Sequence, residues 1–208
     1  FASGLKLVTT DAQNNTVVGT NAGDSFTGTD ANDNTLFGYN AGTAITSADS
    51  NVALGKDALQ SATTGSYNTV VGQSALRDLT TGTNNSIFGI NAALTATGSN
   101  NVAFGANTLR GASNNTGNNN VAVGTGALNA STTGSNNAGI GHDALTANTI
   151  GEQNVAVGTY ALDANTTGTL NVAVGYGAVG ANTTGANNTG IGRNALGSVT
   201  TAESNTAV

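Results

Sequence analysis

The sequence predicts an all-β protein, a parallel β-solenoid with about 17 residues in each coil. Three observations support this fold class. A five-residue unit that begins with asparagine and ends with glycine recurs along the 208 residues. The period is too short for a pair of helices. Glycine, asparagine and threonine dominate the composition, and methionine is absent, which disfavours helices and suits strands and tight turns.

The repeated unit is typified by residues 154–158, Asn-Val-Ala-Val-Gly, and successive copies are 16 to 19 residues apart, most often 17. We expect each copy to form the first strand of a coil. The closing glycines are Gly19, Gly38, Gly55, Gly72, Gly89, Gly105, Gly124, Gly141, Gly158, Gly175 and Gly192. The asparagines four residues earlier are Asn15, Asn34, Asn51, Asn68, Asn85, Asn101, Asn120, Asn137, Asn154, Asn171 and Asn188, and Asn205 opens one more copy.

The rest of each coil follows in a fixed order. After the glycine come two variable residues, and then an Ala-Leu pair such as Ala58-Leu59, which predicts a second strand or a corner. A polar turn ending in Thr-Thr-Gly, such as residues 63–65, closes the coil. We therefore assign residues 14–208 to one solenoid domain, and residues 1–13, with a possible strand at 5–8, to a cap or to an upstream domain. Because the chain begins at Phe1 and ends inside a repeat, we expect it to be a segment of a longer polypeptide.

Alternation along the strand predicts which side chains form the core. Alternate residues of a strand share a face. We expect the large apolar residue before the glycine to point inwards, together with the leucine of Ala-Leu. The predicted core residues are Leu54, Val71, Phe88, Phe104, Val123, Ile140, Val157, Val174 and Ile191.

The residue immediately before this core position is predicted to face outwards, yet it is never charged. A strand that is apolar on both faces is normally covered on both. We therefore expect another copy of the chain to cover the outer face. The predicted oligomer interface is Ala53, Val70, Ile87, Ala103, Ala122, Ala156 and Ala173.

The asparagines are predicted to have a structural role. Identical amide side chains stacked at the strand spacing of about 4.8 Å can form a hydrogen-bonded ladder. Asparagine and glycine also tolerate left-handed backbone at a corner. The asparagines and the closing glycines together constitute the predicted structural ladder.

The charge of the chain argues against several classes of partner. The net charge is −6, with only five lysines and arginines, which argues against nucleic acid and anionic membrane surfaces. No apolar run is long enough to cross a membrane, so we expect no membrane insertion by this segment. Cysteine is absent, which excludes disulfides and thiolate metal sites.

The sequence offers little chemistry for catalysis, and we predict neither an enzyme nor a cofactor. His142 is the only histidine and lies in a variable position, so we interpret it as solvated. Asp24, Asp30 and Asp33 are weak candidates for binding a metal ion. The start of a calcium loop at Asp30 lacks the required glycine and the closing glutamate, which favours a solvated loop.

The Ala-Val-Gly units followed by Ala-Leu, as at residues 154–162, resemble the head repeats of trimeric autotransporter adhesins of the YadA type. The Thr-Thr-Gly-Ser-Asn-Asn turn at 132–137 is similar to repeats in phage and large-virus tail-fibre proteins. The resemblance covers residues 14–208 and implies a left-handed parallel β-roll, a homotrimer and a role in attachment. The coil here is about three residues longer than the adhesin head repeat, and the stalk, anchor and chaperone domains of these families do not occur in this sequence.

Two functions from different classes follow. The first is a structural and attachment module, a trimeric segment of a virion tail fibre or a bacterial surface adhesin, extracellular, with an unknown host receptor or glycan. The alternative is an ice- or surface-binding protein that uses stacked threonine columns. The exposed aromatics expected at Tyr39 and Tyr176 could stack on sugars, but the sequence alone does not identify a receptor.

Overall fold

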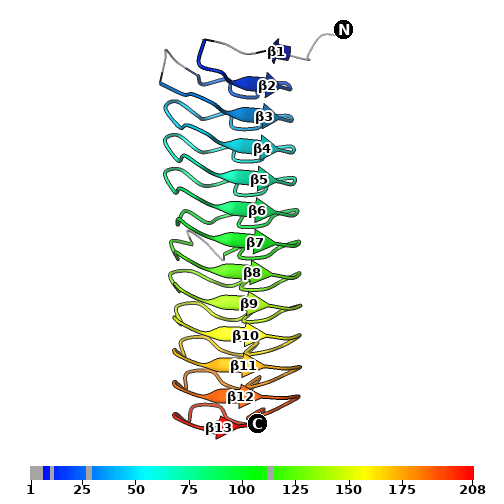
Figure 1. Ribbon diagram of the computed structural model, residues 1–208, viewed down its shortest axis with the longest axis vertical. Helices are drawn as coiled ribbons and strands as arrows, with labels where there is room; N and C mark the ends of the chain where they lie inside the picture. The colour runs from blue at the N-terminus through cyan, green and yellow to red at the C-terminus, as the bar shows by residue number, and fades with distance from the viewer. Residues whose placement is uncertain (1–6, 10–11, 27–29, 112–114) are drawn as a thin grey trace.

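The computed structural model describes residues 7–9, 12–26, 30–111 and 115–208. The coils stack into a rod, with β1 (Leu7–Thr9) and β13 (Thr206–Ala207) at opposite ends (Figure 1). All described strands belong to one sheet in sequence order, which confirms an all-β parallel solenoid with about 17 residues per coil. The strands are β1 (Leu7–Thr9), β2 (Thr16–Val18), β3 (Thr35–Phe37), β4 (Val52–Leu54), β5 (Thr69–Val71), β6 (Ser86–Phe88), β7 (Val102–Phe104), β8 (Val121–Val123), β9 (Ala138–Ile140), β10 (Val155–Val157), β11 (Val172–Val174), β12 (Thr189–Ile191) and β13 (Thr206–Ala207).

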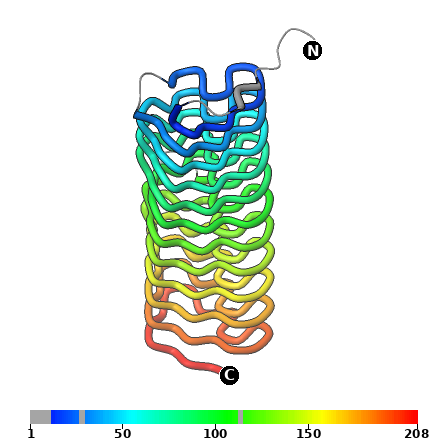
Figure 2. Tube along the Cα trace, turned by 45° about the horizontal axis from the view of Figure 1, so that its top comes forward, coloured from blue at the N-terminus to red at the C-terminus, as the bar shows by residue number. Residues whose placement is uncertain are grey.

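The asparagine-to-glycine unit sets the register of the sheet. From β2 to β13 every strand pairs in parallel with the next, and equivalent residues of successive units lie opposite each other, as Ala156 does with Ala173. The tube trace shows the coils stacked above one another along the whole rod (Figure 2). At the usual strand spacing, the stack from β2 to β13 is about 50 Å long.

The first strand differs from the others. β1 pairs with β2 antiparallel, with Val8 opposite Val17. It occupies the edge of the sheet that precedes the first coil, and so covers an edge that would otherwise expose unpaired backbone groups. Residues 5 and 6, which the sequence placed in the same strand, lie outside the described residues.

Ala-Leu was predicted to form a second strand or a corner; in the coils that the structure describes it forms a corner and no second strand. Ala-Leu lies in a turn, and its leucine has a left-handed backbone, with φ of 51° at Leu59 and 52° at Leu128. This conformation is incompatible with a strand, and it costs a non-glycine residue about 1–2 kcal/mol. Burial of the leucine offsets the cost, because both side chains are fully buried. The prediction that this leucine is a core residue is therefore confirmed.

The asparagine ladder forms as predicted, and it lies inside the coil. Asn51 donates from its backbone N–H and from Nδ2 to the Oδ1 of Asn34, at 3.0 and 3.1 Å. Its Nδ2 also donates across the coil to the backbone oxygen of Gly65, at 3.0 Å. The same backbone bond to the preceding asparagine recurs up to Asn205. Each amide therefore bridges two coils and also ties the start of its own coil to the end.

The prediction that the residue before the closing glycine points into the core is wrong. The residue before the closing glycine faces outwards, with exposed fractions of 45% for Leu54, 52% for Phe104 and 36% for Val174. Only Val18, beside the cap strand, is buried at this position in the described chain. The predicted core residues that lie on the outer face are Leu54, Val71, Phe88, Phe104, Val123, Ile140, Val157, Val174 and Ile191.

The predicted oligomer interface is wrong for the same reason, because its residues fill the interior of the coil. Ala53, Val70, Ile87, Ala103, Ala122, Ala156 and Ala173 are all fully buried. The asparagine fixes the direction: Asn51 is buried, and alternation then turns Val52 out, Ala53 in and Leu54 out. The residue facing inwards is usually small because the coil is thin and the leucine of the turn already occupies much of its interior.

The closing glycines are required both by conformation and by space. Gly158 has φ of +137°, and a Cβ atom there would lie 2.5 Å from the backbone oxygen of Gly175 in the next coil. Neither the backbone conformation nor the contact admits a larger residue. The predicted structural role of the glycine column is thus explained by close packing of one coil on the next.

A second buried amide ladder lies near the C-terminal end. Asn165 Nδ2 donates to Asn148 Oδ1 at 2.8 Å, and Asn182 Nδ2 donates to Asn165 Oδ1 at 2.9 Å. In most earlier coils this inward position holds apolar residues, such as Ile45 and Leu79, which are fully buried, and in the coil before Asn148 it holds the buried Ser131. The coil interior therefore accepts either an apolar stack or a hydrogen-bonded amide stack at the same place.

Candidate functional site

The outward face of the sheet is the most distinctive surface of the rod. We define the outer strip as the first and third residues of strands β3 to β12. Both positions carry apolar or hydroxyl side chains, and neither carries a charge in any of these strands. The first position holds Thr35, Val52, Thr69, Ser86, Val102, Val121, Ala138, Val155, Val172 and Thr189. The third holds Phe37 and the nine residues that were predicted to be core.

The outer strip is about as large as the largest apolar patch on a typical soluble monomer. Two columns of side chains over ten strands cover about 45 Å by 10 Å, on the order of 450 Å². Contiguous apolar patches of this size on soluble proteins are often functional. Near the middle of the strip, Phe88 and Phe104 stack with ring centroids 4.6 Å apart. The strip is therefore continuous from coil to coil and carries no charge along β3 to β12.

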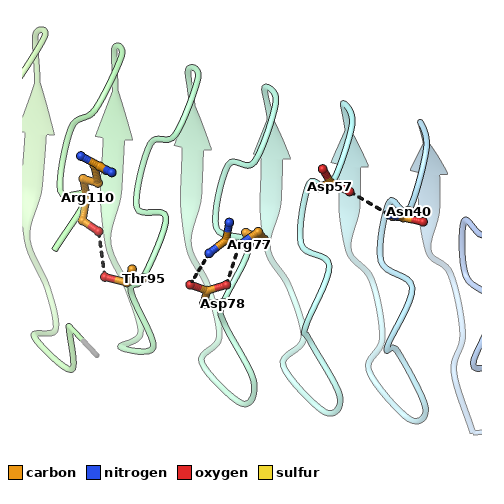
Figure 3. A network of polar contacts seen from close by, with 6 residues as sticks. All are labelled: Asn40, Asp57, Arg77, Asp78, Thr95 and Arg110. Atoms are coloured by element: carbon orange, nitrogen blue, oxygen red, sulfur yellow. Dashed lines mark hydrogen bonds and ion pairs between the residues drawn. The ribbon is translucent and has the colours of Figure 1, made fainter. Parts of the chain in front are cut away.

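Polar contacts join successive coils just beyond the closing glycines (Figure 3). Asn40 Nδ2 donates to Asp57 Oδ1 at 2.9 Å, and Lys56 Nζ lies 2.9 Å from the other carboxylate oxygen. Burial by itself raises the pKa of Asp57, but hydrogen bonds from Lys56 and Asn40 and the charges of Lys56 and Arg77 outweigh it, so the pKa is lowered. Asp57 is thus held ionised as part of a link between two coils.

Two further contacts continue this polar border (Figure 3). Arg77 and Asp78 form a two-pronged ion pair, with Nε–Oδ1 at 2.7 Å and Nη2–Oδ2 at 3.0 Å. The hydrogen bond to Asp78 raises the pKa of Arg77. Thr95 donates its hydroxyl to the backbone oxygen of Arg110 at 2.9 Å. These groups satisfy one another within the rod, and we assign them a structural role.

The weak metal candidates do not form a cluster in the described part of the chain. Asp24, Asp30 and Asp33 are exposed. Asp33 accepts a hydrogen bond from Asn14 Nδ2 at 3.2 Å, which links two coils in the same way as Asn40 and Asp57. No group of three or more potential metal ligands occurs among the residues described. Residues 27–29, between Asp24 and Asp30, lie outside them.

His142 is exposed, as expected for a variable position, and its Nδ1 lies 3.1 Å from Asp143 Oδ2. No nucleophile with a base partner and no enclosed pocket occurs among the described residues. The histidine is instead one end of a row of aromatic side chains, which is considered below. Tyr39 and Tyr176 are both about half exposed, at 49% and 51%.

The threonine columns lie in the turn opposite the strand. In most pairs the first threonine uses its hydroxyl to join coils: Thr132 donates to the backbone oxygen of Thr149 at 3.1 Å, and Thr166 to that of Thr183 at 3.0 Å. The second threonine, such as Thr167, is exposed. One hydroxyl column therefore remains for external contact, and it lies at a bend of the chain, not on the flat sheet.

No protein-family model, no curated protein and no solved structure matches this chain in the three comparisons made. Within the described residues, no helix has the length and apolar character needed to cross a bilayer. The architecture of the chain is therefore established from its own geometry, as a β-solenoid repeat protein.

Proposed function

We propose that this chain is a structural and attachment module, a segment of an extracellular homotrimeric fibre such as a virion tail fibre or a bacterial surface adhesin. The observation that carries the proposal is the outer strip, an uncharged apolar face that runs along ten strands. The resemblance of the repeats to adhesin heads and tail-fibre proteins is the basis for proposing three chains per fibre and a role in attachment. The host receptor is a protein or glycan of unknown identity.

The outer strip supports association between copies of the chain. Parallel sheets are generally covered on both faces. Here the inner face packs on the coil's own turns, while the outer face carries Phe37 at 54% exposure and Leu54 at 45%. Because every coil repeats the pattern, parallel copies in register would place apolar residues opposite apolar residues along the full length. Chains packed in this way would hide their strips around a common axis and leave the turns facing outwards.

The construction of the coil suits a mechanical role. Each coil is joined to the next by backbone pairs, by the buried amide ladder and by hydroxyl-to-carbonyl bonds in the turn. Solenoid coils contact only their neighbours, so stiffness grows with the number of such connections. A rod of this kind would hold a receptor-binding surface at a distance from its anchor.

Light scattering coupled to size exclusion tests the proposal. We expect a particle of three times the chain mass of 20.2 kDa. The variant Leu54→Glu/Ile140→Glu places two charges in the outer strip and should yield monomers that keep the β-type circular dichroism. The matched control Tyr67→Glu/Ile150→Glu changes two residues that are 62% and 50% exposed outside the strip and should remain trimeric. A stable, soluble wild-type monomer would contradict the proposal.

The alternative function, ice or surface binding through threonine columns, has less support. In most pairs the first threonine hydroxyl donates to a neighbouring carbonyl group, and the column of second threonines lies at a bend. A measurement of thermal hysteresis would test it directly, and we expect none.

A further inference from the structure

Four side chains on consecutive coils form a continuous row near the C-terminal end. The rings of His142 and Tyr160 are 5.6 Å apart between centroids, and those of Tyr160 and Tyr176 are 5.9 Å apart. Both pairs are nearly perpendicular, at 86° and 89°. The guanidinium carbon of Arg193 lies 5.7 Å from the centroid of Tyr176. We call these four residues the aromatic row.

The row lies just beyond the closing glycines of β9 to β12. His142, Tyr176 and Arg193 each follow a closing glycine directly, whereas Tyr160 is the second residue after its glycine. The side chain of His142 is 51% exposed, Tyr176 is 51% exposed and Tyr160 is 37% exposed. The row is therefore an open surface that borders the outer strip along the chain and contributes little to the core.

Tyr160 departs from the rule that the other coils follow. Its φ is 57°, in the left-handed region, and the equivalent position elsewhere in the repeat holds asparagine, aspartate, serine or glycine. Those short polar residues suit the conformation and can link coils, as Asn21 does by donating to Asn40 at 3.0 Å. Tyrosine is neither favoured in this backbone conformation nor suited to the short side-chain link between coils. Such local departures tend to occur at functional sites.

Apart from Nδ1 of His142, the polar side-chain groups of the row have no hydrogen-bond or ion-pair partner among the described residues. No hydrogen bond joins the hydroxyl of Tyr160 or Tyr176 to another described residue, and Arg193 makes no ion pair in the part of the chain that the structure describes. His142 contacts Asp143 through Nδ1, which leaves Nε2 directed away from that contact. Three rings and one guanidinium group, with hydrogen-bonding groups at their rims, are thus presented over four coils.

We propose that the aromatic row binds an extended glycan, a linear chain of pyranose sugars lying along the rod axis. A pyranose ring offers apolar C–H faces that stack on aromatic rings and hydroxyl groups that pair with their polar rims. The ring-to-ring spacing is about the length of one sugar residue, and because neighbouring rings are nearly perpendicular, successive sugars meet a ring face and a ring edge in turn. No pocket encloses the described surface, which suits a polymer that contacts several coils and not a small ligand. Arg193 gives the site a preference for a carboxylated sugar.

This proposal rests on the proposed function of attachment, for which it names the class of receptor. A cationic ligand is disfavoured, since Arg193 already places a cation over Tyr176. The open site predicts weak binding by a single chain, strengthened when several copies of the row act together.

Ligand-observed saturation-transfer NMR on the full 208-residue chain tests the proposal, with cellohexaose as the neutral probe and a galacturonate hexamer as the acidic probe. We expect transfer to the sugar ring protons, with tighter binding of the acidic hexamer. Tyr176→Ala and Tyr160→Asn should each weaken binding by about tenfold. Arg193→Gln should remove the preference for the acidic hexamer. Tyr39→Ala changes the same coil position away from the row and should leave binding unchanged.

The variant Tyr160→Asn distinguishes a loss of binding contacts from a loss of folding. Asparagine is the common residue at this position and tolerates its backbone, so the variant should melt no lower than the wild type. Loss of binding then reports lost contacts and not unfolding. Failure of both hexamers to bind, or equal binding by the Tyr160→Asn/Tyr176→Ala double variant, would overturn the inference while leaving a trimeric fibre intact. A monomer that still bound the hexamers would instead overturn the fibre and keep the glycan site.

Discussion

Truncation of one ladder asparagine in the middle of the rod, Asn154→Ala, should destabilise the fold strongly. The Nδ2 of Asn154 donates to Asn137 Oδ1 at 3.1 Å and to the backbone oxygen of Gly168 at 2.8 Å. Its Oδ1 accepts from the backbone N–H and the Nδ2 of Asn171, at 3.0 and 3.1 Å. The substitution therefore removes four hydrogen bonds from a side chain that is fully buried.

The expected loss of stability depends on which hydrogen bonds the partners of Asn154 keep. Asn137 Oδ1 still accepts from the backbone N–H of residue 154, Gly168 still accepts from Asn165, and the side chain of Asn171 still donates to Gly185. The backbone N–H of Asn171, however, loses its acceptor in the interior. An orphaned buried donor costs about 1–3 kcal/mol, and each of the three other bonds about 0.5–1 kcal/mol, so we expect a loss of about 4 kcal/mol.

Asn205→Ala is the matched control, since it changes the same column in the last coil. Asn205 Nδ2 donates to Asn188 Oδ1 and to the backbone oxygen of Glu203, and no described residue donates to its Oδ1. Its loss should cost about 1 kcal/mol. Guanidinium unfolding at one fixed protein concentration measures both variants, and hydrogen exchange at the amide of Asn171 reports whether the damage is local. Equal destabilisation by the two variants would refute the reasoning.

Three further predictions concern other parts of the coil. Gly158→Ala should cost more than about 3 kcal/mol through strain and overlap with the next coil, whereas Gly192→Ala, with no atom within 4 Å of the added carbon, should cost less; chemical unfolding compares them. The pKa of Asp57 is lowered in the folded state, so its contribution to stability is present above its unfolded pKa and is lost as pH falls through the folded pKa. Asp57→Asn should therefore flatten the fall of Tm on acidification. An unchanged slope of Tm against pH would contradict this. Val199→Asn should supply a donor to the buried, unpaired Oδ1 of Asn182 and raise stability by about 1 kcal/mol, which thermal melting would detect.

The period and the ladder could be predicted from sequence because they depend on identity repeated at a fixed interval. A unit that returns every 17 residues places equivalent residues in register whatever the conformation between them. The positions of the strands, the stacking of Asn51 on Asn34 and the buried leucine at Leu59 all follow from that register. At Ala-Leu a strand and a corner both stayed open, because sequence spacing does not reveal the left-handed backbone of Leu59 that selects the corner.

The second amide ladder was missed although the sequence contains its signal. Asn148, Asn165 and Asn182 are each 17 residues apart and precede the closing part of the turn. Asparagine is common in turns, so the residue type alone does not single these positions out. Their common spacing, matched to the coil, distinguishes a stacked amide from an ordinary turn residue.

The inward and outward faces of the strand could not be assigned from hydrophobicity, because both faces are apolar. Size suggested that Leu54 belonged inside and Ala53 outside. The buried Asn51 reverses this assignment, since its amide must reach across the coil to Gly65. A polar residue with specific hydrogen-bond partners therefore determines which face of the strand is buried.

This reversal strengthens the case for association between chains. With the predicted direction, partners would have met through alanine, glycine and a few branched residues, which offer little area to bury. With the observed direction, the outer strip presents phenylalanine, leucine, isoleucine and valine instead, and each larger side chain removes more apolar surface from water when covered. The small residues fill a thin coil, and the large residues are left for contacts that one chain cannot make by itself. The same strand therefore supports the fold through Ala53 and, in our proposal, the assembly through Leu54.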